Sequence, residues 1–174
     1  MLPLKEATAE KHKLAERMPF NGLMFSGRLT ASQYGEYLKS QLAIFSTLEN
    51  NFEFPNEGLK RVSAVSEDLG YLGVSDVSTD SATESYIQYL KGLTQDEANA
   101  HIYLNYLAIM FGGQMMKEKT PGQGKMYDFD NMMECAGSIR AIQKDEWAGE
   151  VNKGFDFMIE IFKELENELL QTEG

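Results

Sequence analysis

Apolar residues recur at three- and four-residue steps along most of the chain, and this spacing constrains the fold more than any other feature. One such run comprises Tyr34, Leu38, Phe45, Leu48 and Phe52, and the same spacing returns in FDFMIEIFKEL at 155–165. It places apolar side chains on one face of a helix. The sequence shows no sustained strand-type alternation. It therefore predicts an all-α fold.

Helix starts are marked by three capping boxes, in which a hydroxyl residue is followed three positions later by Glu or Gln. These are Thr30 to Gln33, Ser81 to Glu84 and Thr94 to Glu97. Segments with Gly or Pro lie between them and break the helices. We expect a loop at 75–85 and helices near 3–17, 31–52, 57–69, 82–91, 95–119, 127–145 and 147–171. With 174 residues, 43% of them hydrophobic, a single domain over 1–174 is expected.

Charge and cysteine content narrow the functional classes. The chain has 16 Lys and Arg against 27 Asp and Glu, a net charge of −11, which argues against binding to nucleic acid or to an anionic membrane. Cys135 is the only cysteine and cannot form an internal disulfide, and the N-terminus lacks an apolar signal-peptide core. No apolar run approaches about 18 residues. We expect a monomeric, cytoplasmic protein.

Gly112 and Gly113 lie in HIYLNYLAIMFGGQMMK (101–117), a segment that otherwise has the composition of a buried helix. Each glycine costs a helix roughly 0.5–1 kcal/mol relative to alanine. The helix ends here with Gly112 as its cap, or another helix packs closely, or something else needs the missing side chains. The sequence around the pair leaves these explanations open.

Ionisable chemistry is sparse. The only histidines are His12 and His101, and there is neither a Cys/His cluster nor an E-x-x-H pattern, so a multi-ligand zinc site and a di-iron site are not indicated. On a helix, Lys5 lies two turns before His12, about 10 Å away, and Glu16 follows at i+4. A flat ligand bound by His12 can therefore reach Lys5 with an edge carboxylate, while Glu16 orients the imidazole. Spacing alone favours the simpler interpretation, a half-exposed histidine in a solvated Lys/Glu helix.

Three segments together resemble the heme oxygenase family and occur in the family's order. LKEATAEKHKLAE (4–16) resembles its proximal helix with the axial histidine, and GRLTASQYGEYLKSQLAIFSTLE (27–49) resembles its second helix. The segment 101–117 resembles the distal helix with its G-G-Q. The resemblance implies a helical bundle that holds heme between a proximal and a kinked distal helix.

The resemblance also implies roles for individual residues. His12 is the expected axial ligand of the heme iron, with Glu16 beside it. Gly112 and Gly113 let the distal helix approach iron-bound oxygen closely, because they lack Cβ. The positions expected to contact the propionates or to wall the pocket are Lys5, Tyr103, Arg140, Phe155 and Phe162. His101 matches a position that does not bind the iron and is expected to be structural.

Three departures from the family pattern concern polar groups. Ile109 occupies the position of a distal aspartate that many members carry, although plant-type members also lack it. Phe45 replaces a tyrosine, and Ala9 replaces a lysine one turn before His12. Water beside the oxygen must then be held by Asn105 or by backbone carbonyls.

The implied reaction is cleavage of heme b, both substrate and cofactor, to biliverdin, Fe(II) and CO with O2. The chain has no G-x-G-x-x-G after a strand and so no sign of a flavin or nicotinamide site. External electrons, expected from ferredoxin, are therefore required, and residues 5–17 offer a local basic face for it. Two alternatives remain: a heme carrier or sensor without turnover, and a thiaminase-like enzyme with Cys135 as nucleophile.

Overall fold

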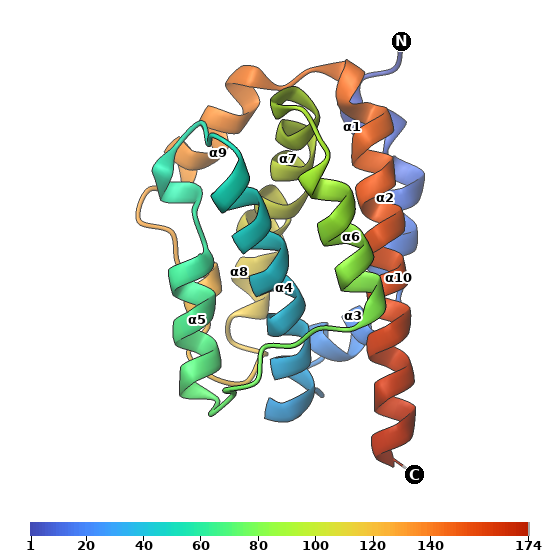
Figure 1. The fold of residues 1–174 in the computed structure, drawn as a ribbon, viewed down its shortest axis with the longest axis vertical. Helices are drawn as coiled ribbons and strands as arrows, with labels where there is room; N and C mark the ends of the chain where they lie inside the picture. Colours follow the sequence, from blue (N-terminus) through green and yellow to red (C-terminus); the bar gives the residue numbers. More distant parts are fainter. Residues whose placement is uncertain (174) are drawn as a thin grey trace.

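The structure, a computed structural model, describes the backbone of residues 1–173 and the side chains of residues 1–169. Helices account for nearly all the regular structure, and no strand occurs in this part of the chain (Figure 1). The first half contains α1 (Leu4–Ala7), α2 (Ala9–Glu16), α3 (Pro19–Phe25), α4 (Ala31–Asn51), α5 (Val62–Tyr71) and α6 (Ser81–Lys91). The second half contains α7 (Gln95–Phe111), α8 (Gly113–Met116), α9 (Met132–Ile142) and α10 (Ala148–Glu173). The short 3-10 turns are η1 (Glu57–Leu59), η2 (Lys125–Tyr127) and η3 (Asp145–Trp147).

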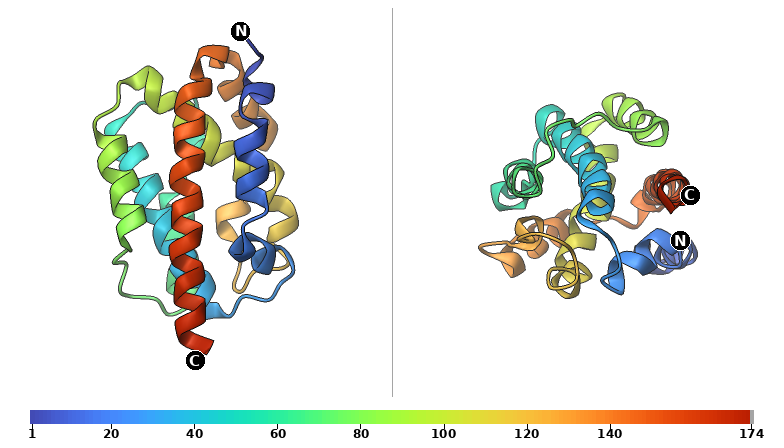
Figure 2. Two further views of the ribbon diagram at one scale, coloured as in Figure 1. Left: turned by 90° about the vertical axis from the view of Figure 1, so that its right-hand side faces the viewer. Right: turned by 90° about the horizontal axis from the view of Figure 1, so that it is seen from below.

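The long helix α10 runs along one side of the molecule, at the right in Figure 1 and facing the viewer in Figure 2 (left), and packs against α2, α3, α6 and α7. Seen along the long axis, α4 lies near the centre with other helices around it (Figure 2, right). It packs against α5 and α6. The predicted all-α fold is therefore confirmed. Within the described residues, no helix has both the length and the apolar character needed to cross a bilayer.

Two of the three predicted capping boxes are present. The hydroxyls of Thr30 and Thr94 each accept the backbone N–H three residues on, and the Gln or Glu at that position accepts from the cap backbone. The prediction for Ser81 is wrong, because Asp80, one residue earlier, accepts the N–H of Thr83 and caps α6. Ser81 instead donates its hydroxyl to Glu164 on α10. The preceding loop therefore ends at residue 80.

The predicted helix boundaries differ from the structure where backbone or tertiary contacts intervene. The helix expected at 3–17 is interrupted at Thr8, whose hydroxyl donates to the Leu4 carbonyl. The helix α3 is absent from the predicted set, although Pro19 at its first position is a start signal. The helix expected at 95–119 divides at Gly112 into α7 and α8. The helix expected at 127–145 is shorter, because α9 begins only at Met132.

Arg61 separates the turn η1 from helix α5 in the segment predicted as one helix at 57–69. Its buried guanidinium donates to the carbonyls of Gly58, Leu59, Lys60, Met126 and Asp128. It also lies 3.7 Å from the ring centroid of Phe129. One side chain thus ties the start of α5 to the loop after α8, which local sequence does not reveal.

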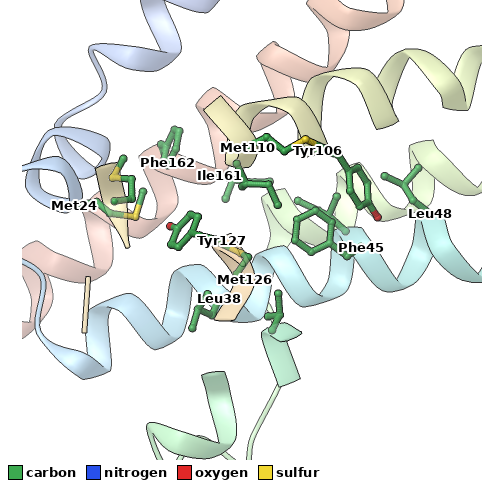
Figure 3. Packing of buried hydrophobic residues seen from close by; sticks show 14 of the residues in the cluster. Met24, Leu38, Phe45, Leu48, Tyr106, Met110, Met126, Tyr127, Ile161 and Phe162 are labelled. Carbon is green, nitrogen blue, oxygen red and sulfur yellow. The ribbon is translucent and has the colours of Figure 1, made fainter. Parts of the chain in front are cut away.

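The main core fills the space around α4, α7 and α10. Figure 3 shows Phe45 beside Tyr106, whose ring centroids lie 4.8 Å apart, and Tyr127 among core side chains from other elements. A second apolar cluster joins Leu4 and Ala15 to Trp147, Val151 and Phe155. The N-terminal helices are therefore held against α10 by apolar packing as well as by polar contacts.

Candidate functional site

A cavity of about 550 Å³ opens between the N-terminal helices α1 to α3 and the helices α4, α7, α8 and α10. Its volume lies in the range of sites for small organic ligands. Most of its lining is apolar, including Met24, Ile44, Leu104, Leu107, Met158 and Ile161. An apolar cavity with a few polar groups is the usual form of a binding site for a flat organic molecule.

The cavity brings together every site residue predicted from the sequence, although they come from several helices. They are Lys5, His12, Glu16, Tyr103, Asn105, Gly112, Gly113, Arg140, Phe155 and Phe162. Ile109, at the position of the missing aspartate, also lines it and is buried. Phe45 lies outside the lining and packs in the core against Tyr106.

His12 lies in the wall that α2 contributes. Its side chain is 58% exposed, and its Nε2 lies 3.0 Å from Oε1 of Glu16, as expected from the i+4 spacing. Phe155 from α10 stacks against the imidazole, with ring centroids 5.6 Å apart and planes inclined by 23°. The ring is thus held on one side by a carboxylate and on one face by an aromatic residue. The contact with Glu16 occupies one ring nitrogen, and the other is the one available as a ligand.

Two cations and a tyrosine hydroxyl add polar character to the cavity. Among the described side chains, neither Lys5 nor Arg140 forms an ion pair with an acidic residue, and the Arg140 guanidinium lies 5.1 Å from the ring of Phe111. Burial raises the pKa of Tyr103, and the charge of Arg140 opposes this. A ligand with carboxylates at its edge therefore meets uncompensated positive charge here.

The two glycines have different surroundings. A Cβ on Gly112 would meet only the Ala108 carbonyl, one turn back in its own helix, at 3.2 Å. A Cβ on Gly113 would lie 2.5 Å from the ring of Tyr127, which is closer than side chains pack. The absence of a side chain at Gly113 is thus already explained by close packing, one of the explanations that the sequence leaves open. At Gly112 no neighbouring element explains it.

Asn105 has both amide hydrogens engaged. Its Nδ2 donates to the Tyr86 hydroxyl at 3.0 Å and to the His101 carbonyl at 2.8 Å. Since a carbonyl only accepts, the second contact fixes which amide atom is nitrogen. The amide oxygen Oδ1 has no protein partner among the described residues and is not fully enclosed. It is therefore the atom of Asn105 that remains to bind water.

Some lining residues are not predicted from the sequence. Met24 and Phe25 come from α3, and Ser40 and Gln41 come from the polar positions of α4. Pro19 signals the start of α3, but the glycines at 22 and 27 have the character of helix breaks. No local pattern distinguishes Ser40 or Gln41 from solvated residues, because their place depends on how α4 crosses the bundle.

Cys135 and His101 do not line the cavity. Cys135 is 1% exposed, and burial raises the pKa of its thiol, whereas a reactive cysteine has a lowered pKa. His101 is fully buried, with Nδ1 2.7 Å from the Tyr86 hydroxyl and Nε2 3.0 Å from Glu150. The structure thus gives no support to a thiaminase-like nucleophile at Cys135.

Comparison with known proteins shows to which family the chain belongs. The heme oxygenase family model matches residues 2–143, which is most of its length. The chain belongs to the heme oxygenase family. Two relatives illustrate the range of this heme oxygenase family. The heme oxygenase of Pyropia yezoensis is 24% identical over 206 residues, covering 97% of this chain and 86% of that protein. Heme oxygenase 1 of Gallus gallus is 31% identical over 134 residues, covering 66% of this chain but only 45% of that protein.

Solved structures of heme oxygenases have the same fold. Heme oxygenase-1 from the cyanobacterium Synechocystis, solved in complex with heme, superposes with a TM-score of 0.84 and 21% identity. The match covers 98% of this chain and 94% of that one. The heme oxygenase of Leptospira interrogans gives a TM-score of 0.78 with 24% identity, over 92% and 97% of the two chains. The bundle is therefore the heme oxygenase fold.

Proposed function

We propose that this chain cleaves heme to biliverdin, with release of iron and carbon monoxide, using O2 and electrons from an external donor. The observation that carries the proposal is a single cavity lined by His12 from α2, Gly112 at the end of α7, and the cations Lys5 and Arg140. Membership of the heme oxygenase family supports the same reaction. Bound heme supplies the iron that activates oxygen and the porphyrin that is cut.

The residues present fit heme in three respects. The apolar lining suits the faces of a porphyrin, the exposed imidazole of His12 suits its iron, and the unpaired cations suit its propionates. Gly112 adds a fourth, because it lines the cavity and has no side chain to fill it. A compact apolar metabolite would need neither the cations nor the imidazole.

His12 is the residue that we propose would hold the heme iron, and Glu16 would steady the imidazole by accepting a hydrogen bond from the nitrogen that does not bind iron. Such a bond fixes the ring and makes the ligating nitrogen more basic. In the structure Glu16 contacts Nε2. Nδ1 is therefore the nitrogen that this arrangement would leave free to bind the iron.

Lys5, Tyr103 and Arg140 are proposed to orient heme through its propionates. Arginine can bind a carboxylate through two parallel hydrogen bonds, while lysine acts as a point charge. Phe155 and Phe162 line the cavity from α10. By holding the propionates, these residues would decide which edge of the porphyrin is cut.

In the wall formed by α7 and α8, Gly112 is proposed to leave room for oxygen and Asn105 to hold ordered water, while Gly113 lines the same wall and leaves room for Tyr127. With Ile109 apolar, the Asn105 amide oxygen is the side-chain group that we propose holds water near the meso edge. Water held there can pass protons that the reaction consumes.

We propose ferredoxin as the electron donor, and a monomeric, cytoplasmic enzyme. Lys5, Lys13 and Arg17 carry positive charge on the N-terminal helices, whereas Lys11 is paired with Asp156 at 2.6 Å. An acidic electron carrier would therefore meet a smaller basic face than the sequence suggests.

The test begins with a hemin titration followed by Soret absorption. The hemin complex is then mixed aerobically with ferredoxin and its reductase, with catalase present to remove free peroxide. We expect biliverdin by chromatography. Hemin that binds through His12 but yields no biliverdin would instead support the heme carrier or sensor.

A further inference from the structure

A chain of buried polar groups runs from the cavity wall to the surface, and the proposed chemistry does not use most of it. It begins at Asn105 and Tyr86, which both line the cavity, and continues through His101 to Glu150. Tyr86 and His101 are almost fully buried, while the Glu150 side chain is 15% exposed. The Tyr89 hydroxyl donates to Glu150, and Nζ of Lys153 lies 3.3 Å from Oε2 of Glu150.

The charge states of this chain follow from its contacts. Burial lowers the pKa of His101, although Glu150 opposes the effect. Burial tends to raise the pKa of Glu150, but hydrogen bonds from Tyr89, His101 and Lys153 outweigh it and lower the pKa. Glu150 is therefore a carboxylate and His101 is neutral near pH 7.

These charge states give each hydrogen bond a direction. Because a carboxylate only accepts, Nε2 of His101 carries the proton and donates to Glu150. Nδ1 is then an acceptor, so the Tyr86 hydroxyl must donate to it. The oxygen of Tyr86 consequently accepts the N–H of Asn105, which leaves the amide oxygen of Asn105, a residue of the cavity lining, as an acceptor without a partner among the described residues.

We propose that the side chains of Glu150, His101 and Tyr86 are positioning groups that hold Asn105 in the orientation set by the His101 carbonyl, so that an acceptor faces cavity water beside Ile109. The proposal rests on the proposed heme cleavage, because it assigns this water to that reaction. The fixed amide oxygen then does, without a charge, what an aspartate at position 109 would do as an acceptor. A residue on the far side of α7, at the surface of α10, thereby sets the polarity of the distal wall.

The packing around His101 favours one orientation of its imidazole, and so one direction for the hydrogen bonds that it makes. Gly154 brings α10 so close that a Cβ there would lie 2.4 Å from Leu104 and 3.1 Å from Nδ1 of His101. This packing leaves little room for the imidazole to turn. The titratable and charged groups that face it are Tyr86 and Tyr89 from α6, Glu97 from α7, and Glu150 and Lys153 from α10.

The first test observes hydrogen-bond direction without turnover. With only two histidines, ¹⁵N-histidine spectra are simple, and His12→Ala assigns the remaining signals to His101. We expect His101 to be protonated on Nε2 near pH 7, with its Nδ1 resonance shifted in Tyr86→Phe. Glu150→Gln should increase the population protonated on Nδ1. A spectrum of His101 that neither change alters would overturn the proposal.

The second test measures consequences for the reaction. Tyr86→Phe and Glu150→Gln should bind hemin within about twofold of wild type but form biliverdin about tenfold more slowly, the effect of one lost hydrogen bond. The matched control is Tyr106→Phe, which removes a buried hydroxyl that donates to Glu49 outside the cavity. It should turn over at the wild-type rate.

A third test repeats the rate measurement in an Ile109→Asp background. If Tyr86 only stabilised the fold, Tyr86→Phe would slow biliverdin formation equally with and without this change. In that background a carboxylate accepts from water directly, so Tyr86→Phe should cost less than about twofold in rate. Equal losses in both backgrounds would overturn the positioning role. If the wild-type protein shows His101 protonated on Nε2 yet makes no biliverdin, the proposed heme cleavage is wrong. The role of Glu150, His101 and Tyr86 in turnover is then wrong as well. If Tyr86→Phe does not fold, Glu150→Gln at the surface end carries the same test.

Discussion

Among single residues, His12 makes the sharpest prediction. It is more than half exposed, so His12→Ala should leave the helical fold intact, as judged by circular dichroism. The native Soret spectrum should be lost and hemin affinity should fall about tenfold or more, because one coordinate bond is removed. Added imidazole should partly restore the spectrum. Unchanged ligation in the variant would exclude His12 as the ligand.

The charge on Lys5 should control the orientation of heme. In Lys5→Glu a negative charge replaces the expected propionate partner, so hemin should bind about tenfold less tightly or rotate in its plane. Chromatography of the biliverdin isomers detects the rotation, with Lys13→Glu as a matched charge reversal at a residue that does not line the cavity. Wild-type affinity together with an unchanged isomer ratio in Lys5→Glu would remove Lys5 from the site.

Burial of His101 should make stability depend on pH. Its folded pKa is lowered, so between that pKa and the unfolded value of about 6.5 the unfolded state binds more protons. The free energy of unfolding should therefore fall as pH drops below about 6.5, by at most about 1.4 kcal/mol per pH unit for this group. Urea unfolding at pH 5 to 7 measures the slope. The same pH dependence should be seen in His12→Ala, where His101 is the only histidine. A free energy of unfolding that does not change with pH in that variant would contradict the prediction.

At the level of helices, the junction between α7 and α8 separates two roles of adjacent glycines. Gly113→Ala should lower the free energy of unfolding by about 1–3 kcal/mol, because its Cβ overlaps the Tyr127 ring. Gly112→Ala should leave stability within about 1 kcal/mol and reduce biliverdin formation more than hemin affinity, because it adds volume at the cavity wall where we propose that oxygen enters. Chemical denaturation and hemin turnover of the pair test this. Equal effects of both changes on stability would contradict it.

The helices also show how far sequence reasoning reaches. Thr30 and Thr94 are predictable as caps because a capping box is a local interaction of four consecutive residues. The heme oxygenase motifs also predict residues that line the cavity, because a short motif carries its site residue with it along the chain. The packing of Gly113 on Tyr127 is not foreseeable, because it depends on how the loop after α8 returns. The orientation of Asn105 depends on α6 and α10, which lie far from it in sequence.

At the scale of the whole molecule, hemin should increase stability, because the cavity that we propose it fills is lined by helices from both ends of the chain. At about a hundredfold excess over its Kd, a ligand that binds only the folded state adds about 2.7 kcal/mol to stability. For a chain of this length, Tm should rise by roughly 5–10 °C. Thermal unfolding with and without hemin measures the shift, and His12→Ala should reduce it. No shift at saturating hemin would mean that the cavity is not its binding site.

The long helix α10 also sets an order of events during synthesis. It supplies Phe155, Met158, Ile161 and Phe162 to the cavity. It also anchors the first helices, since Asn152 donates to the Ala7 carbonyl and Asp156 pairs with Lys11. A nascent chain on the ribosome that exposes only α1 to α9 therefore has its histidine but lacks the wall against which that histidine stacks. We therefore expect heme to be captured only after α10 has left the ribosome.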